Sequence, residues 1–373
     1  MEIKTSGFCS MMMMIMFSCF LGILDASCFN IAGVDSWLIP IIGSILGTPI
    51  LLLYLYIYNY RKDLNINQLN IYLFGKKLGR VIAFIMLLFA LTFTMVSFWN
   101  LTSFVSSQYL YNTPEFFIDI IFVATTFYFF SKSEQTIFRS SLILIYIVLF
   151  LYGISFFGLI DKIKIDNVKP FLEHGIIPVL KGVYNYISYV ILPIFTLSVI
   201  NRNKVNKKSL SKWIIITYFI SNFLIFTMLF LLISVFGIEL ATLYQYPTYH
   251  ILKRVFIGGF IERLENVLSI QYIIVLFIPC AFSNYYSLKS IRDITNIKKN
   301  IYIFPILILL MFLSQYIFKS NTYGEYFLIN IYPIFMGIIL IIIPIFTFQD
   351  FILNFYIYIS AYFHINVSIY YFP

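Results

Sequence analysis

Residues 161–182, DKIKIDNVKPFLEHGIIPVLKG, interrupt a chain that is otherwise almost continuously apolar. Three lysines, two aspartates, a glutamate and a histidine lie in this stretch before Lys181. The segments on both sides are apolar over about 20 residues each, which is the length that a helix needs to cross the hydrocarbon layer of a membrane. We count five such segments before the stretch and five after it, so the stretch divides the expected spans into two equal sets.

The composition of the whole chain is that of a polytopic membrane protein. Of its 373 residues, 61% are hydrophobic and 11% are charged, and the mean hydropathy is +0.91, whereas roughly a quarter of the residues of a soluble domain are charged. The expected spans are residues 8–30, 36–58, 81–108, 115–131, 138–159, 183–200, 213–237, 265–287, 301–318 and 327–348.

The division into five and five spans predicts an all-α, transporter-like fold built from two inverted repeats. The repeats would cover about residues 8–159 and 183–348, within a single transmembrane domain at residues 1–348. Residues 349–373 form an apolar tail, and the sequence indicates no role for it. A short helix is also expected after the second span, because Ile66, Leu69 and Leu73 recur at helical spacing among polar residues. We expect this helix to lie in the membrane interface.

The distribution of basic residues predicts the orientation. With the N-terminus in the cytoplasm, about two thirds of the 25 lysines and arginines fall in the segments on the cytoplasmic side. Such an excess is typical of cytoplasmic loops, so we expect both termini in the cytoplasm. Because the net charge of +9 is explained by these loops, it gives no reason to expect nucleic-acid binding.

No motif in the sequence indicates an enzyme, a metal site or a cofactor. The chain contains no Walker loop, dinucleotide fingerprint or HExxH motif, and its four cysteines lack the spacing of metal ligands. Its three histidines are scattered over a loop, the segment after span 7 and the tail. We therefore expect no catalytic residues, no metal and no cofactor.

Several short motifs resemble the spore germination permease family, the membrane-spanning B subunits of nutrient germinant receptors. The resemblance covers about residues 8–345. Asp35-Ser36-Trp37 opens the second span as Asp-Ala-Trp does in that family. The central stretch and the segment after span 7 carry the other motifs: Asn167, Pro170, Glu173, Gly175, Pro178 and Lys181-Gly182, then Pro247-Thr248-Tyr249 and Phe260-Ile261-Glu262-Arg263-Leu264-Glu265.

The resemblance implies a sensor. The family is related to the amino acid–polyamine–organocation transporters, and its members act in the inner membrane of the dormant spore with an A subunit and a lipoprotein C subunit. It implies that this chain detects a small nutrient (an amino acid, a sugar or a nucleoside) and triggers ion release. Two alternatives stay open: a working amino-acid symporter, and a pore or scaffold subunit that binds no nutrient itself.

In a transporter-like fold the ligand binds where spans 1 and 6 lose helical hydrogen bonds near the middle of the membrane. Gly22 and Pro193 lie about midway along these spans, although both could instead serve packing or simple kinks. Asn100 and Gln271 are polar groups within spans 3 and 8 that need partners. The residues expected to bind the ligand are Ser18, Leu21, Gly22, Asn100, Tyr189, Pro193 and Gln271.

The segment after span 7, residues 239–260, is expected to form a helix, because Leu252, Val255 and Phe256 share a helical face. This helix could close over the ligand site as a lid, or it could simply cap the bundle. Glutamates at the start of span 8 would be favoured there by the helix dipole. The residues expected to contact the lid or a partner subunit are Tyr246, Pro247, Glu262, Arg263 and Glu265.

The placement of the acidic residues bears on the symporter alternative. Proton-driven uptake generally needs an ionisable group deep in the membrane. Asp25 and Asp119 fall within a turn or two of the expected outer ends of their spans, and spans 1, 3, 5, 6, 9 and 10 carry no such group near their centres. The sequence therefore argues against a proton-coupled symporter.

Overall fold

The computed structural model describes residues 2–206, 209–254, 266–267, 269–297, 304–318, 320–339, 341 and 345. Most of these residues belong to helices, and the one β interaction among them is an isolated bridge between Ile3 and Val205. In chain order the helical elements are α1 (Thr5–Cys19), η1 (Phe20–Leu24), α2 (Asp25–Ala32), η2 (Gly33–Trp37), α3 (Leu38–Tyr60), α4 (Ile66–Gln108), α5 (Glu115–Ser131), α6 (Glu134–Phe157), η3 (Ile160–Lys162), η4 (Ile165–Val168), α7 (Ile176–Tyr186), η5 (Ile187–Ile191), η6 (Leu192–Val199), η7 (Arg202–Lys204), α8 (Leu210–Phe236), α9 (Ile238–Leu243), α10 (Pro247–His250), η8 (Ile251–Arg254), α12 (Ile270–Thr295), α13 (Phe304–Ile317), α14 (Asn321–Tyr326) and η10 (Phe327–Ile331).

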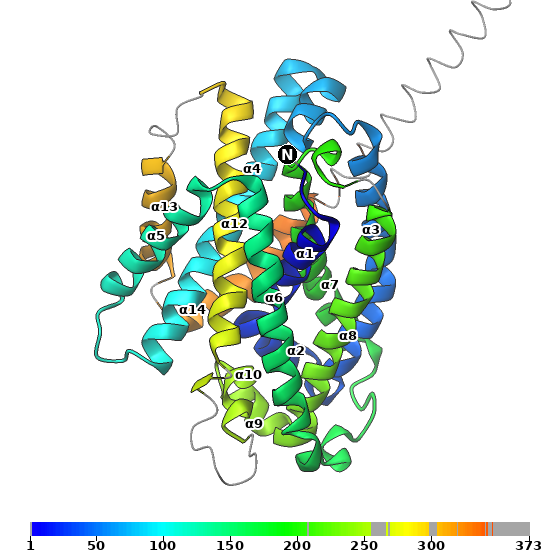
Figure 1. Ribbon diagram of the computed structural model, residues 1–373. Helices are drawn as coiled ribbons and strands as arrows, with labels where there is room; N and C mark the ends of the chain where they lie inside the picture. The colour runs from blue at the N-terminus through cyan, green and yellow to red at the C-terminus, as the bar shows by residue number, and fades with distance from the viewer. Residues whose placement is uncertain are drawn as a thin grey trace, which may run out of the picture.

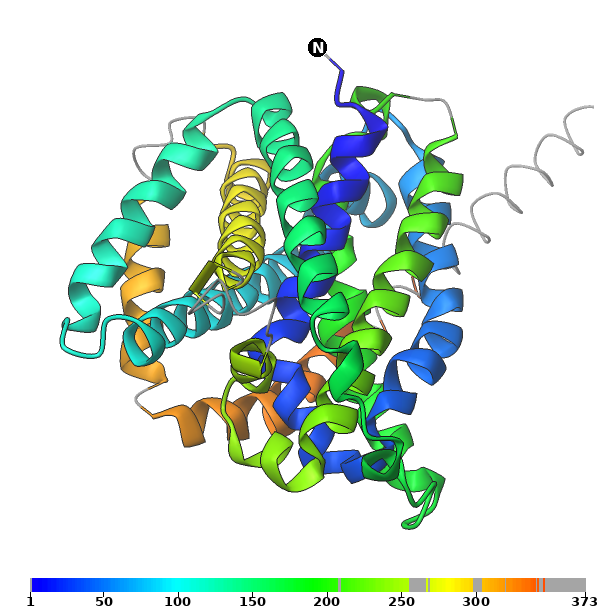
Figure 2. The ribbon, with the colours of Figure 1, turned by 60° about the horizontal axis from the view of Figure 1, so that its bottom comes forward.

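Helix α1 runs through the middle of the bundle and packs against α6, α8 and α12 (Figure 1). Almost all of its residues are buried, including every residue from 11 to 16. A helix that is apolar on all sides is stable where other elements cover it all round. By contrast, α5 and α13 lie together on one flank of the bundle (Figure 2).

Six helical stretches of the described chain are long and apolar enough to cross a membrane, and α1 and part of α13 are apolar but shorter. The chain is therefore an all-helical, multi-pass membrane protein. The arrangement of ten spans in two repeats stays a prediction. The six stretches are Asp25–Tyr60, Ile66–Gln108, Glu134–Lys162, Ile176–Val199, Leu210–Phe236 and Ile270–Thr295.

Two core spans change helical type partway along their length. Between α1 and α2, the five residues of η1 form a π-helical turn, and the backbone N–H of Asp25 bonds to the carbonyl of Phe20. In the sixth expected span, η5 is likewise a π-helical turn, and the 3-10 helix η6 follows it. The backbone pairing is thus rearranged into a wider turn at both places, followed by a tighter one in the sixth span, rather than lost as expected from the sequence.

The short helix expected after the second span is the first part of α4. Asn65 caps it, because its side chain accepts from the Gln68 backbone and the Gln68 side chain accepts from the Asn65 backbone, as in a capping box. Gly75 (φ +75°) separates this part from the long remainder of α4. Its apolar face is buried, with Ile66 and Leu69 3% and 4% exposed, so it packs on the protein. Its place in the membrane interface stays a prediction.

The central stretch is anchored to neighbouring helices at one end of the bundle. The backbone N–H of Leu172 donates to Asp35 Oδ1 at 2.9 Å, and Asn167 Nδ2 donates to the Ser234 carbonyl at 3.0 Å. The stretch also contains the first residues of α7, which begins at Ile176, seven residues before the predicted start of span 6. Contacts to these helices thus fix the connection between the two sets of spans.

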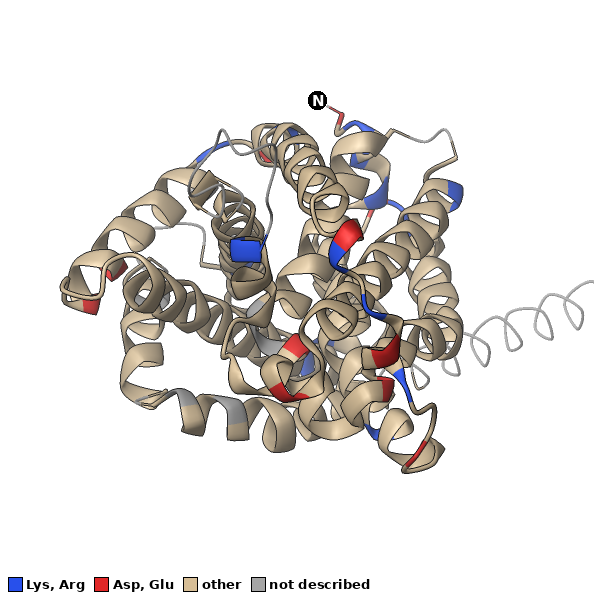
Figure 3. Cartoon of the chain, turned by 90° about the horizontal axis from the view of Figure 1, so that it is seen from below, with Lys and Arg blue, Asp and Glu red and all other residues tan. Residues whose placement is uncertain are grey.

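The bundle has two ends that are used as reference points below. The N-terminal end, uppermost in Figure 1, carries residues 2–6, 59–68, 131–135, 201–206 and 285–293. The distal end carries residues 109–114, 158–175 and 237–254. Seen from the distal end in Figure 3, charged residues lie mainly on loops and helix ends, and the bodies of the helices are largely uncharged. This distribution agrees with helices that lie in lipid.

Candidate ligand site

The π-helical turns of the two core spans face each other. Elements η1 and η5 are in contact, and both pack on neighbouring core helices. From α4, Asn100 Nδ2 donates to the carbonyl of Leu21 in η1 at 3.5 Å, and Asn100 is itself 1% exposed. The break in the first core span therefore lies beside a buried polar side chain from another helix.

A cavity of about 40 Å³ adjoins η1. A water molecule needs about 10–15 Å³ of such space, so the cavity holds a few waters at most. It is also far smaller than the roughly 300–1,000 Å³ of a typical ligand pocket. The site is thus closed in this conformation. Its lining is mostly apolar, with Thr248 and Gln271 as polar members: Phe17, Phe20, Leu21, Val148, Tyr152, Leu224, Ile225, Met228, Thr248, Gln271 and Tyr272.

Four of the seven residues predicted to bind the ligand come together here. Leu21 and Gln271 line the cavity, and Asn100 bonds to the backbone of Leu21. Gly22 lies within η1 itself. These positions come from three helices, so the packing of the bundle and not their sequence spacing brings them to one place.

The other three predicted ligand residues lie away from the cavity. Ser18 Oγ donates to the carbonyl of Ile15 in its own helix at 3.2 Å. The Tyr189 ring stacks on Tyr332, with ring centroids 4.5 Å apart, and its hydroxyl bonds to the Leu328 carbonyl. Pro193 is buried near the start of η6. These side chains serve contacts within α1, between η5 and the η10 region, and within η6.

The structure places a further polar group at the break, Asp25, which was not among the residues predicted to bind the ligand. Asp25 is the first residue of α2 and is fully buried. Its Oδ1 accepts from the Ala26 backbone N–H at 2.9 Å, and its Oδ2 accepts from the Thr248 hydroxyl at 2.9 Å. The N-terminus of a helix favours a carboxylate, and an ionisable residue inside an apolar span marks a functional position by default. That second signal was available in the sequence.

In the segment expected to form a lid, the structure describes α9, α10 and η8, and Val255 and Phe256 of the expected helical face lie outside the described residues. Tyr246, which precedes α10, is 1% exposed and donates to Ser103 Oγ at 3.2 Å, and Pro247 is the first residue of α10. The remaining residues predicted for the lid or a partner contact, Glu262, Arg263 and Glu265, lie outside the described residues. Through Thr248, α10 is docked on Asp25 at the break.

Aromatic rings join α10, and the residue before it, to the bundle. The Phe104 ring stacks on Tyr272 at a centroid distance of 4.2 Å, and it meets Tyr246 and Tyr249 edge-on at 5.2 and 5.4 Å. At the outer side of α10, His250 stacks on Tyr244 at 4.2 Å. Burial, with a smaller effect of the Lys253 charge, lowers the pKa of His250 to about 4, so its ring is neutral at pH 7.

The described part of the chain offers no metal centre. No group of three or more His, Cys, Asp and Glu side chains in it is placed to hold a metal ion. Its buried polar groups near the break are a carboxylate, a hydroxyl and two amides, which can donate to and accept from a small polar molecule. The arrangement is therefore suited to binding.

Comparison with known proteins gives a consistent result. The model of the spore permease family, described as spore germination protein, matches residues 2–323. Spore germination protein KB of Bacillus subtilis (strain 168) is 22% identical over 66% of this chain and 66% of its own length. Spore germination protein XB of Bacillus anthracis is 27% identical over 61% of this chain and 63% of its own length. The chain thus spans just under two thirds of the length of these relatives.

Among solved structures, the manganese transporter of Eremococcus coleocola, crystallised with an aromatic bis-isothiourea compound, is similar in fold. The TM-score is 0.59 at 13% sequence identity, and the match covers 89% of this chain and 76% of the transporter. At this identity the likeness concerns the fold alone, which is that of a transporter. Because the family model matches most of the chain, from residue 2 to residue 323, this protein belongs to the spore permease family of spore germination proteins.

Proposed function

We propose that this protein is the membrane-spanning subunit of a nutrient germinant receptor, and that it binds a small nutrient beside the π-helical turn η1. One observation carries the proposal. Asp25, Asn100, Thr248 and Gln271, from four separate helices, converge at η1. Buried polar groups are costly in a membrane unless they serve structure or function.

In this proposal, the ten spans form two inverted repeats of five within residues 1–348, and residues 349–373 have no assigned part. The N-terminal end of the bundle faces the cytoplasm, because most basic residues lie on that side, and the membrane is the inner membrane of the spore. The partners are an A subunit and a lipoprotein C subunit. If a cysteine introduced at Asn206 reacted with an impermeant thiol reagent from outside, this orientation would be wrong.

Nutrient binding requires the cavity to expand, since a volume of about 40 Å³ does not hold an amino acid, a sugar or a nucleoside. The wall that can move is α10, because it is a short helix held mainly by rings and by the bond from Thr248 to Asp25. A polar group of the nutrient would then replace the Thr248 hydroxyl at the Asp25 carboxylate. The change in position of α10 would be the first step of the signal.

A symporter is the second candidate, and the burial of two carboxylates favours it. Asp25 is fully buried, and Asp119 is 3% exposed and accepts from Thr102 and Gln315. Both groups are more enclosed than the sequence suggests, which weakens the argument against proton coupling. Accumulation of a labelled amino acid by proteoliposomes under a pH gradient would favour the symporter over the receptor.

The receptor proposal is tested by substituting Gln271, which lines the cavity. We expect Gln271→Leu to raise the nutrient concentration needed for half-maximal germination by about tenfold or more, the cost of one or two lost hydrogen bonds, at unchanged protein abundance in the spore. The matched control is Gln108→Leu, the same chemical change at the end of α4 outside the cavity. A screen of the purified receptor against amino acids, sugars and nucleosides by thermal shift identifies the nutrient.

Equal responses of the Gln271→Leu, Gln108→Leu and unmodified proteins, at equal abundance, would remove the cavity from the nutrient site. A normal response from this chain expressed without its partner subunits would contradict the receptor assembly.

A further inference from the structure

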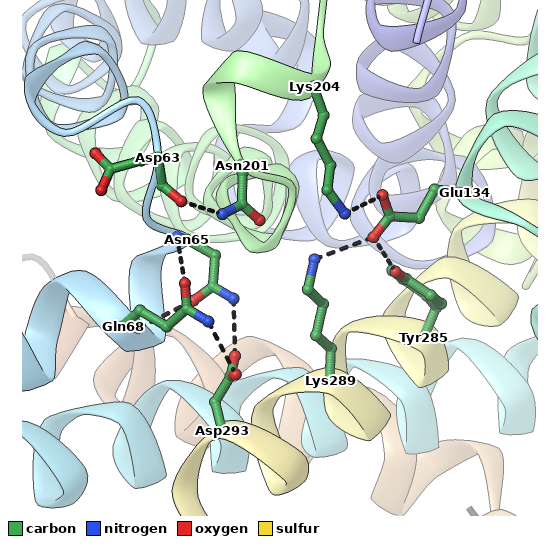
Figure 4. Close-up of polar contacts among 9 residues, drawn as sticks. All are labelled: Asp63, Asn65, Gln68, Glu134, Asn201, Lys204, Tyr285, Lys289 and Asp293. Carbon is green, nitrogen blue, oxygen red and sulfur yellow. Dashed lines mark hydrogen bonds and ion pairs between the residues drawn. The ribbon is translucent and has the colours of Figure 1, made fainter. Parts of the chain in front are cut away.

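The N-terminal end of the bundle is closed by a group of charged and polar side chains that the candidate ligand site does not use (Figure 4). At its centre is Glu134, the first residue of α6. Glu134 Oε2 accepts from Lys204 Nζ at 2.8 Å, and Oε1 accepts from Lys289 Nζ at 3.1 Å and from the Tyr285 hydroxyl at 2.6 Å. We refer to these four residues as the Glu134 cluster.

The Glu134 cluster is partly removed from water. The side chains of Glu134 and Lys289 are 20% and 17% exposed, and that of Lys204 is 43% exposed. Charge-assisted hydrogen bonds in such surroundings are stronger than ion pairs on a fully exposed surface. One carboxylate compensates two ammonium groups, so loss of its charge leaves both without that compensation.

Glu134 and two of its three donors lie on two spans, α6 and α12, that line the cavity of the ligand site. Tyr285 and Lys289 belong to α12, and the first turn of α12 carries Gln271. Gln271 and Tyr285 are separated by roughly 20 Å along the helix at 1.5 Å per residue. Glu134 begins α6, which contributes Val148 and Tyr152 to the cavity wall. A displacement of either span at the ligand site therefore changes the geometry at Glu134.

A second polar contact at the same end provides a comparison. Asp293, also on α12, accepts from Asn65 Nδ2 at 2.8 Å and from Gln68 Nε2 at 3.3 Å. This contact joins α12 to the first part of α4. It includes no bond to α6 or to the span that contains η5. It therefore holds α12 at the N-terminal end without linking the two spans of the ligand site.

We propose that the Glu134 cluster is a latch that holds the N-terminal end closed without nutrient and opens when nutrient binds beside η1. This proposal rests on the proposed function, since it describes how that site is regulated. The nutrient shifts the equilibrium between the latched and open states by binding the open state more tightly. The latch sets how rarely the open state is populated before nutrient arrives.

The test is Glu134→Gln in spores, a change that keeps the size of the side chain and removes its charge. We expect germination without nutrient to rise about tenfold or more, which is the usual size of the coupling between two sites of one protein. We also expect less nutrient to be needed for the half-maximal response. Lys289→Met should act in the same direction. The matched control is Asp293→Asn, which removes a carboxylate charge from α12 and should leave nutrient-free germination unchanged.

A second measurement keeps the test valid if a variant is less abundant in spores. Ser290 is buried at the same end, so a cysteine introduced there, with the native cysteines replaced, reports on opening in the purified receptor. We expect its reaction with a soluble thiol reagent to be slow in the otherwise unmodified receptor, and several-fold faster with Glu134→Gln. If Glu134→Gln changed neither nutrient-free germination nor this labelling rate, the latch would be ruled out.

The double variant Glu134→Gln with Gln271→Leu separates failure of the latch from failure of the ligand site. If both proposals hold, it germinates without nutrient and gains little from nutrient. A full nutrient response in Gln271→Leu together with raised nutrient-free germination in Glu134→Gln would place the nutrient elsewhere and keep the latch. Nutrient-free germination as low as in the unmodified spores would contradict the latch.

Discussion

The two ends of the helical bundle are closed by different kinds of contact. At the distal end, α10 is held by buried rings, such as Tyr249 edge-on against Phe104 at 5.4 Å, and by the Thr248 hydroxyl on the Asp25 carboxylate. At the N-terminal end, Glu134 accepts three hydrogen bonds, two of them from lysines. The first closure is mainly apolar and the second depends on charge.

This difference suggests how recognition and response are divided between the ends. Apolar contact is largely non-directional, so rings around α10 can repack about a bound molecule without a large penalty. Charge-assisted bonds depend on distance and direction, and the members of a network support one another. We therefore expect graded adjustment at the distal end and an all-or-none change at the N-terminal end.

The largest effect of a substitution is expected at Asp25, the polar contact of the distal end. Asp25→Asn removes the charge that accepts the Thr248 hydroxyl, and hydrogen bonds to charged groups contribute about 1.5–3 kcal/mol. We expect the nutrient concentration for half-maximal germination to rise about 10- to 100-fold, measured alongside protein abundance. Asp119→Asn is the matched control, since Asp119 is also buried and bonded to Thr102 and Gln315. Equal losses in both variants would show a general cost of altering buried acids.

A smaller effect is expected where α3 packs on η5. A Cβ added at Gly47 of α3 would lie 2.1 Å from Ile191 Cδ1 and 2.6 Å from the Tyr218 hydroxyl oxygen, and that hydroxyl donates to the Ser44 carbonyl at 2.9 Å. Overpacking of this kind costs about 1–3 kcal/mol. We expect Gly47→Ala to lower the thermal stability of the purified receptor.

Gly153→Ala in α6 is the control for Gly47→Ala, because a Cβ there meets no atom within 4 Å. The same substitution should be neutral or stabilising by roughly 0.5–1 kcal/mol, as for glycine replaced inside a helix. If both alanine variants melted at the same temperature, close packing of α3 on η5 would not be what holds this turn in place.

The smallest effect is expected from the pH dependence of α10. The pKa of His250 is about 4 in the docked position, below its ordinary value of 6.5, so the docked state binds fewer protons than an undocked one between these values. The docking of α10 on the bundle is therefore unaffected above about pH 6.5 and weakens as the pH falls towards 4. We expect a several-fold change in the half-maximal nutrient concentration between pH 7.5 and pH 5.

His250→Phe keeps an aromatic ring against Tyr244 and cannot take up a proton. The half-maximal nutrient concentration of this variant should therefore change between pH 7.5 and pH 5 only as far as other titrating groups, such as the Glu134 cluster, make it change. The difference between the unmodified protein and this variant is the quantity to measure. A variant with the same pH profile as the unmodified protein would show that His250 does not control docking.

The sequence alone determined the class of the protein and the positions of most apolar helices. The expected span 115–131 coincides with α5, and the span 36–58 lies close to Leu38–Tyr60. These predictions work because lipid imposes one requirement, an apolar run of about 20 residues, which is visible along the chain. The motifs around the central stretch likewise sufficed to indicate the family, which the match over residues 2–323 confirmed.

Only the tertiary structure decided which side chains meet. Leu21 and Gln271 share a cavity while Ser18 and Tyr189 do not, although all four looked equivalent in sequence. A helix that is apolar on every side has no amphipathic pattern from which its inward face can be read.

The two contacts that distinguish the ends of the bundle also depend on the tertiary structure. Thr248 lies 223 residues from Asp25, and Lys289 lies 155 residues from Glu134. The π-helical turns add to the difficulty, because each extra residue in a turn rotates the faces of all the residues that follow it. Composition and order along the chain thus determine which helices form, whereas their rotation and packing determine which polar groups are brought together.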